Sequence, residues 1–75
     1  MQQAISIKLK SSFLTEAIYN EAKQVLIIVF RSGVKYGYKD VTVQKFNRLK
    51  NAKSKSSYFC NYIRGKYITK KIENN

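Results

Sequence analysis

Basic and aromatic side chains are interleaved in the C-terminal part of this chain, and both kinds can bind a nucleic-acid strand. Between Val41 and Ile72 there are nine lysines and arginines and no acidic residue, with three tyrosines among them. Cations neutralise phosphates, and aromatic rings offer faces on which unpaired bases stack. Because no base-reading motif is present, the pattern predicts low-specificity binding to RNA or single-stranded nucleic acid. The candidate cations are Lys45, Arg48, Lys53, Lys55, Arg64, Lys66, Lys70 and Lys71.

Three side chains, Arg64 among them, have two interpretations each. Tyr36 and Tyr38 lie on one face of an expected strand, where they could stack on bases or pack beneath helices. Arg64 could contact a phosphate, or hold a helix end by pairing with Asp40 or a backbone carbonyl. The sequence leaves these alternatives open.

The charge of the chain favours an acidic partner. Fifteen lysines and arginines against four acids give a net charge of +11, and such an excess repels itself in the folded state. A polyanion would relieve the repulsion. A lysine-rich and asparagine-rich composition can also follow from an AT-rich genome, so the charge alone does not identify nucleic acid.

The residues that usually carry catalysis or bind metals are scarce and scattered. The chain has no histidine and a single cysteine, Cys60, which we expect to be a small core residue beside Phe59. The three glycines lack the spacing of a phosphate-binding loop. We therefore expect a binding module without enzymatic activity, cofactor or metal. The four acids are Glu16, Glu21, Asp40 and Glu73.

Two features predict a soluble protein of a reducing cytoplasm. One cysteine cannot form an internal disulfide. The longest apolar run, Val25–Phe30, is far shorter than the roughly 20 residues of a membrane-spanning helix, and the N-terminus lacks the apolar segment of a signal peptide.

Alternation of apolar and polar residues predicts the strands of an antiparallel sheet. Val25–Phe30 is apolar on both faces, which is typical of a central strand, and Gly33 then turns the chain into a return strand. The segment that begins at Leu14 can form either a strand to Tyr19 or a short helix to Ala22. The expected strands are residues 4–10, 14–19, 25–30, 34–38 and 67–72.

A three-residue spacing of apolar side chains predicts an amphipathic helix from Val43, capped by Asp40 or Thr42. Its apolar positions are Val43, Phe46, Leu49 and Ala52.

A second short helix is expected over residues 57–64, with Gly65 at its end. Its apolar side would consist of Phe59, Tyr62 and Ile63. Residues 73–75 are expected to form a frayed tail.

The predicted fold class is α+β: an antiparallel sheet of four or five strands with two short helices packed on one face, in a single domain of residues 1–75.

An apolar strip is expected on the other face of this sheet. If Leu26 and Ile28 face the helices, then Val25, Ile27 and Val29 point away from them. An uncovered patch of this kind indicates a partner, a second copy of the chain, or a cover formed by Ile5, Ile7 and Leu9. The alternative function is therefore that of an accessory protein, for example phage-encoded, that docks on an acidic host or virion protein.

The order of several motifs resembles the KTSC domain, a family named for its occurrence at the C-terminus of some lysyl-tRNA synthetases. The likeness covers about residues 11–72 and is most specific where the pair Tyr36-x-Tyr38 and the ending Phe59-x-x-x-Ile63-Arg64-x-x-Tyr67 occur together. Its other parts are Ser11-Ser12, Leu26-x-Ile28-x-Phe30-x-x-Gly33, Asp40-Val41, Phe46-x-x-Leu49-x-x-Ala52-x-Ser54-Lys55 and Tyr58-Phe59.

This resemblance implies a domain that also occurs alone in short bacterial and phage proteins. It supplies no catalytic residue, and RNA binding is the leading suggestion for its function. The chain departs from the family pattern at Val41-Thr42, where a Val-Pro turn is common, and at Ser56, where glycine is common. It also has Val25, Ile27 and Val29 where polar residues are more usual, so the expected apolar strip is a feature of this chain.

Overall fold

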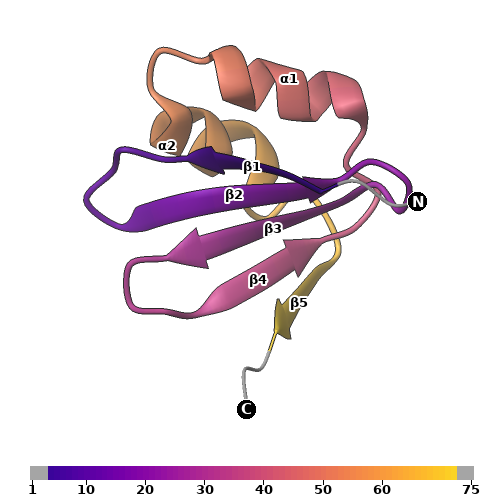
Figure 1. Cartoon of the computed structure of the whole chain (residues 1–75), viewed down its shortest axis with the longest axis horizontal. Helices are drawn as coiled ribbons and strands as arrows, with labels where there is room; N and C mark the ends of the chain where they lie inside the picture. Colours follow the sequence, from indigo (N-terminus) through magenta and orange to yellow (C-terminus); the bar gives the residue numbers. More distant parts are fainter. Residues whose placement is uncertain (1–3, 73–75) are drawn as a thin grey trace.

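The computed structural model describes residues 4–72, which form one open antiparallel sheet with helices on one face (Figure 1). Five strands pair in sequence order, and the last returns after the helices to pair with β4 at the sheet edge. The expected α+β class is confirmed, while the expected tail at 73–75 lies outside the described residues. The elements are β1 (Ala4–Lys8), β2 (Leu14–Asn20), β3 (Val25–Phe30), β4 (Lys35–Tyr38), α1 (Val43–Asn51), α2 (Lys55–Tyr58), the π-helical turn η1 (Phe59–Ile63) and β5 (Thr69–Ile72).

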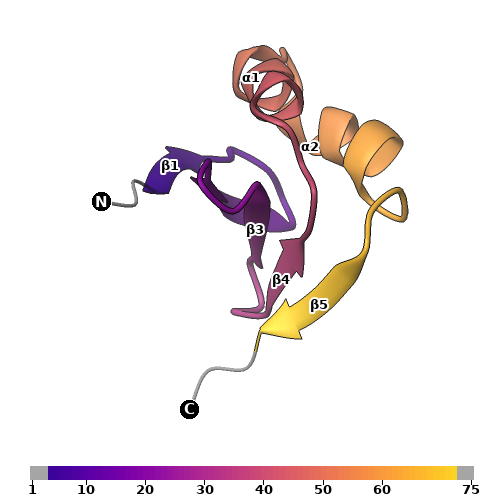
Figure 2. The same ribbon diagram turned by 90° about the vertical axis from the view of Figure 1, so that its right-hand side faces the viewer.

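The pairing register decides which side chains face the helices. Tyr19, Leu26 and Tyr38 lie side by side across three strands, and all three are buried. Their neighbours along each strand point to the opposite face, because side chains alternate. The sheet is curved, and both helices lie against the same side of it (Figure 2).

A bulge in β2 explains why this segment could be taken for a helix. The register between β2 and β3 shifts between Leu14 and Glu16, so that Leu14 and Ala17 both face the core although they are three residues apart. The Thr15 hydroxyl at the bulge donates to the Val29 carbonyl at 3.1 Å. The expected strand is therefore correct, and the alternative helix from Leu14 to Ala22 is wrong.

Helix α1 begins where the sequence predicts. The Thr42 hydroxyl caps it by accepting from the Lys45 amide at 3.3 Å, while Asp40 occupies the preceding turn with a φ of 62°. Phe46 stacks on Tyr19 with ring centroids 4.6 Å apart. The Tyr19 hydroxyl donates to the Val41 carbonyl at 2.6 Å; burial, with a smaller contribution from the negative charge of Glu21, raises the pKa of this phenol.

The second helix begins at Lys55, two residues earlier than expected, and widens into η1. Residues four apart share a face in this wider turn, so Phe59 and Ile63 stay in the core as expected. Tyr62 is 53% exposed instead of packing with them, and Cys60 is exposed, so the expected core role of Cys60 is wrong. Gly65 then reverses the chain with a φ of 75°.

The apolar strip exists, but the first strand does not cover it. Ile5 pairs with Tyr19 and Ile7 with Ala17, which places both side chains on the helix side of the sheet. Leu9 is buried in the core on that same side, so the expected cover by Ile5, Ile7 and Leu9 is wrong. The strip consists of the half-buried Ile18, Val25, Ile27, Val29 and Ile72, all on the face turned away from the helices.

Candidate nucleic-acid interface

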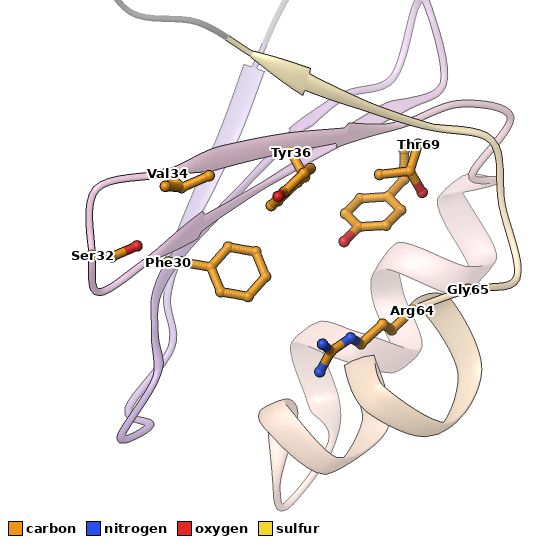
Figure 3. A pocket seen from close by; sticks show the side chains of 8 residues that line it. Phe30, Ser32, Val34, Tyr36, Arg64, Gly65 and Thr69 are labelled. Carbon is orange, nitrogen blue, oxygen red and sulfur yellow. The ribbon is translucent and has the colours of Figure 1, made fainter.

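A hollow of about 440 Å³ opens where the β3–β4 hairpin, β5 and the end of η1 meet (Figure 3). We call it the aromatic pocket. Side chains of the sheet form one wall, and Arg64 extends across from the opposite side. The residues that line it are Phe30, Ser32, Val34, Tyr36, Tyr38, Arg64, Gly65 and Thr69.

The aromatic wall of this pocket continues into the core. Phe30 and Tyr36 are both half-buried, and their rings meet edge to face with centroids 5.5 Å apart. Phe30 also meets the buried ring of Phe59 at 6.1 Å. The pocket is therefore positioned by the same contacts that hold the helix on the sheet.

The two candidate tyrosines have different environments. Tyr38 is 3% exposed and packs edge to face against Phe59 at 5.6 Å, which leaves no ring face for a base. Burial raises the pKa of the Tyr38 phenol, and the nearby positive charge of Arg64 opposes that rise. Tyr36 is the member of the pair that a ligand in the pocket can reach.

Arg64 stands at the turn between η1 and β5 with an exposed side chain. Its backbone amide donates to the Phe59 carbonyl at 2.8 Å, which fixes the start of the side chain at the pocket mouth. Within residues 4–72, Arg64 forms no ion pair with Asp40. The guanidinium thus has donors to offer a ligand.

The lysines near β5 fall on different faces. Lys71 lies opposite Tyr36 in the β4–β5 pairing and so shares the pocket side of the sheet. Lys70 lies opposite Gly37, on the face turned away from the helices. Lys66 is exposed immediately after Gly65. Of these three predicted contacts, Lys66 and Lys71 flank the aromatic pocket and Lys70 does not.

A second hollow, of about 320 Å³, lies between the end of β1 and the α1–α2 connection. We call it the lysine pocket, since its lining is Lys8, Lys10, Lys53, Ser54 and Lys55. Lys53 and Lys55 were among the predicted contacts. Lys8 and Lys10 were missed, although their spacing of two on an expected strand indicated that both would point to one side.

The remaining predicted cations lie on α1. The Lys45 ammonium is 5.7 Å from the centre of the Tyr62 ring, and Tyr62 in turn packs on Tyr58 at 4.7 Å. Arg48 is exposed on the same helix. The predicted cations thus occupy several separate places and do not line a single groove.

No group of three or more metal-binding side chains comes together within residues 4–72. In the same part of the chain, no helix has both the length and the apolar character needed to cross a membrane.

Comparison with known proteins places these features in a family. Residues 10–67 match the family model of the KTSC domain. A lysine–tRNA ligase of Trichormus variabilis is 38% identical over 61 residues, which is 81% of this chain and 11% of the ligase, so the chain spans only a small part of that enzyme. A crystal structure of a KTSC domain protein from Yersinia pestis covers 95% of this chain and all of its own, with a TM-score of 0.86 and 27% identity. Because the family model matches most of the sequence and the fold agrees with that of a solved member, the chain belongs to the KTSC domain family.

Proposed function

We propose that this domain binds RNA or other single-stranded nucleic acid with low sequence specificity, and that one unpaired base enters the aromatic pocket. The main support for the proposal is that the half-buried Tyr36 and Phe30 and the exposed guanidinium of Arg64 line the same pocket. Each base stacked on an aromatic ring contributes about 1–3 kcal/mol in proteins that bind single strands.

The size and chemistry of the pocket fit this ligand. A volume of about 440 Å³ falls within the roughly 300–1,000 Å³ of pockets for small organic groups. Arginine presents a planar fork that can stack on a base or bind a phosphate through two parallel hydrogen bonds. Lys66 and Lys71 would add positive charge where the backbone of the strand leaves the pocket.

Low specificity follows from the small number of polar groups in the pocket. The hydroxyl of Thr69 already donates to the Tyr67 carbonyl at 3.0 Å, so the main side-chain groups that can donate to a base edge are the hydroxyls of Ser32 and Tyr36 and the guanidinium of Arg64. A lysine–tRNA ligase contains a segment similar to this chain. Because that relative acts on tRNA, the similarity supports an RNA ligand.

The proposed role is that of a binding module in the cytoplasm, without catalysis or cofactor. The chain contains no histidine to act as a base. Glu16, one of its few acids, accepts a hydrogen bond from the Ser6 hydroxyl, and Cys60 has no histidine to activate it.

Fluorescence anisotropy with labelled single-stranded RNA, single-stranded DNA and duplex DNA tests the proposal. The single strands should bind more tightly than the duplex. If four to six phosphates are neutralised, log K should fall with log salt with a slope of about −3 to −4, at about −0.7 per phosphate. An affinity that does not depend on salt concentration, or the absence of binding at low salt, would overturn the proposed function.

The apolar strip supports a second candidate function, docking on an acidic protein. The strip is flanked on the same face by Lys35 and Lys70, so a complementary partner has an apolar centre and an acidic rim. A second copy fits less well, because each chain carries a net charge of +11.

Protein capture after nuclease treatment, combined with measurement of mass in solution, tests this candidate. Binding of an acidic partner should persist after nuclease treatment and should be lost in the Val29→Lys variant. The affinity of that variant for RNA should stay at the wild-type level. A homo-oligomer that dissociates with Val29→Lys would instead make the strip a contact between copies.

A further inference from the structure

The lysine pocket gathers like charges that nothing in its lining neutralises. Four lysines and one serine surround a hollow of about 320 Å³. Like charges held close together destabilise the folded state, and an anion with several charges removes that cost. Lys55 is half-buried and its ammonium donates to the Ala52 carbonyl at 3.3 Å, so one of the four cations is already held in place.

The two segments that carry the lysines are fixed by contacts of their own. Leu9 is buried between Lys8 and Lys10, and its amide donates to the Thr15 carbonyl at 2.9 Å. On the other side, the Ser54 hydroxyl accepts from the Ser57 amide at 3.4 Å and donates to the Ser57 hydroxyl at 3.0 Å. The backbones on both sides of the pocket are therefore positioned before any ligand binds.

A further cation connects this pocket with the aromatic pocket. Lys10 lines the lysine pocket and Ser32 lines the aromatic pocket. Their chain neighbours, Ser11 and Arg31, are in direct contact, because the Arg31 guanidinium donates to the Ser11 carbonyl at 2.9 Å and to the Ser12 carbonyl at 3.1 Å. Figure 1 shows the β1–β2 turn, the β3–β4 turn and the α1–α2 connection at the same end of the sheet.

We propose that the lysine pocket is a second binding site on the same nucleic-acid strand, which holds backbone phosphates while the aromatic pocket holds a base. Arg31 continues the positive surface between the two sites. The lysine pocket has no aromatic side chain, so its ligand is the phosphodiester backbone and not a base. This inference rests on the proposed function and extends the interface to Lys8, at the end of β1, and to Lys10, in the turn that follows it.

The test compares two double variants with the same change in charge. Lys8→Glu with Lys10→Glu alters the lysine pocket, whereas Lys23→Glu with Lys39→Glu alters two exposed lysines that line neither pocket. The probes are a dinucleotide, chosen as too short to be expected to span both sites, and a single-stranded RNA of about twelve nucleotides, which falls within known site sizes. Circular dichroism of each variant checks folding, and Lys10→Gln with Lys53→Gln provides a milder change.

With the longer RNA, the pocket variant should bind at least about tenfold more weakly than the control variant. Its salt slope should be shallower by about 1.4, which corresponds to two lost phosphate contacts at about 0.7 each. Dinucleotide affinity should be the same in both variants. Equal losses of affinity and slope in the two variants would overturn this inference and leave the proposed function intact. Failure of the wild-type protein to bind the longer RNA would overturn both.

Discussion

The aromatic pocket and the lysine pocket differ in what forms their walls. The aromatic pocket is an opening in the core, since Phe30 and Tyr38 contact the fully buried Phe59. The lysine pocket is formed by exposed or half-exposed side chains of two surface segments. One site therefore depends on packing and the other on charge, and substitutions should separate their contributions to stability, affinity and salt dependence.

The largest expected effect is on stability, where the two pockets should differ most. Phe59→Ala should lower the free energy of unfolding by about 3–5 kcal/mol, because it leaves a cavity beneath the aromatic pocket. A domain of this size has a stability of only about 3–5 kcal/mol, so urea denaturation should show a largely unfolded protein. Phe59→Leu should be milder. Lys10→Ala should stay within about 0.5 kcal/mol of wild type, and a large loss there would contradict the distinction.

The next largest effect concerns base stacking in the aromatic pocket. Tyr36→Leu removes the ring that a base can reach and should weaken RNA binding by about 1–3 kcal/mol, which is roughly a factor of 5 to 150. The salt slope should not change, because no phosphate contact is lost. Tyr36→Phe keeps the ring and serves as the control. If Tyr36→Phe weakened binding as much as Tyr36→Leu, stacking would not be the role of this residue.

A smaller effect should distinguish the shape of Arg64 from its charge. Arg64→Gln should weaken RNA binding and reduce the salt slope by about 0.7, if the guanidinium contacts one phosphate. Arg64→Lys retains the charge and should keep the slope, while affinity still falls because the planar fork is gone. Equal salt slopes for all three proteins would indicate that Arg64 contacts the base alone.

The sequence predicts elements well where local pattern and tertiary packing agree. The strand Val25–Phe30 has the predicted bounds, because a β-branched run buried on one face and half-buried on the other suits no other element. Helix α1 begins at the predicted Val43 because Thr42 supplies a local cap. The core role of Phe59 and Ile63 also follows from spacing.

The errors arise where tertiary structure changes the local geometry. Tyr62 and Cys60 are exposed because the second helix widens to a π turn, which shifts the residues that face the sheet. Ile5 and Ile7 point toward the helices because of the register between β1 and β2, which sequence alternation alone does not determine.

The candidate site shows the same limit. Tyr36 and Arg64 were predicted by residue type, but the burial of Tyr38 depends on the position of Phe59 across the core. The lysine pocket joins Lys8 and Lys10 to Lys53 and Lys55, which are more than forty residues away in the chain. Charge density along the sequence favoured the C-terminal half and therefore missed the two cations at and just after the end of β1.

The smallest expected effect tests whether Tyr38 belongs to the core and not to the open part of the aromatic pocket. Burial raises the pKa of its phenol above 10.0, its ordinary value, while Arg64 opposes the rise. Below that value the phenol is protonated in both states, so pH has no effect through this group. Above it the unfolded chain loses the proton first, and stability falls by up to about 1.4 kcal/mol per pH unit until pH reaches the pKa of the folded state.

Tyr38→Phe lacks this group, so its loss of stability above pH 10 should be less steep than that of wild type in urea denaturation. Arg64→Gln should extend the loss to higher pH, because it removes the charge that stabilises the phenolate. Identical alkaline profiles for wild type and Tyr38→Phe would mean that the phenol is solvated in the folded protein, and Tyr38 would then join Tyr36 as a residue open to a ligand.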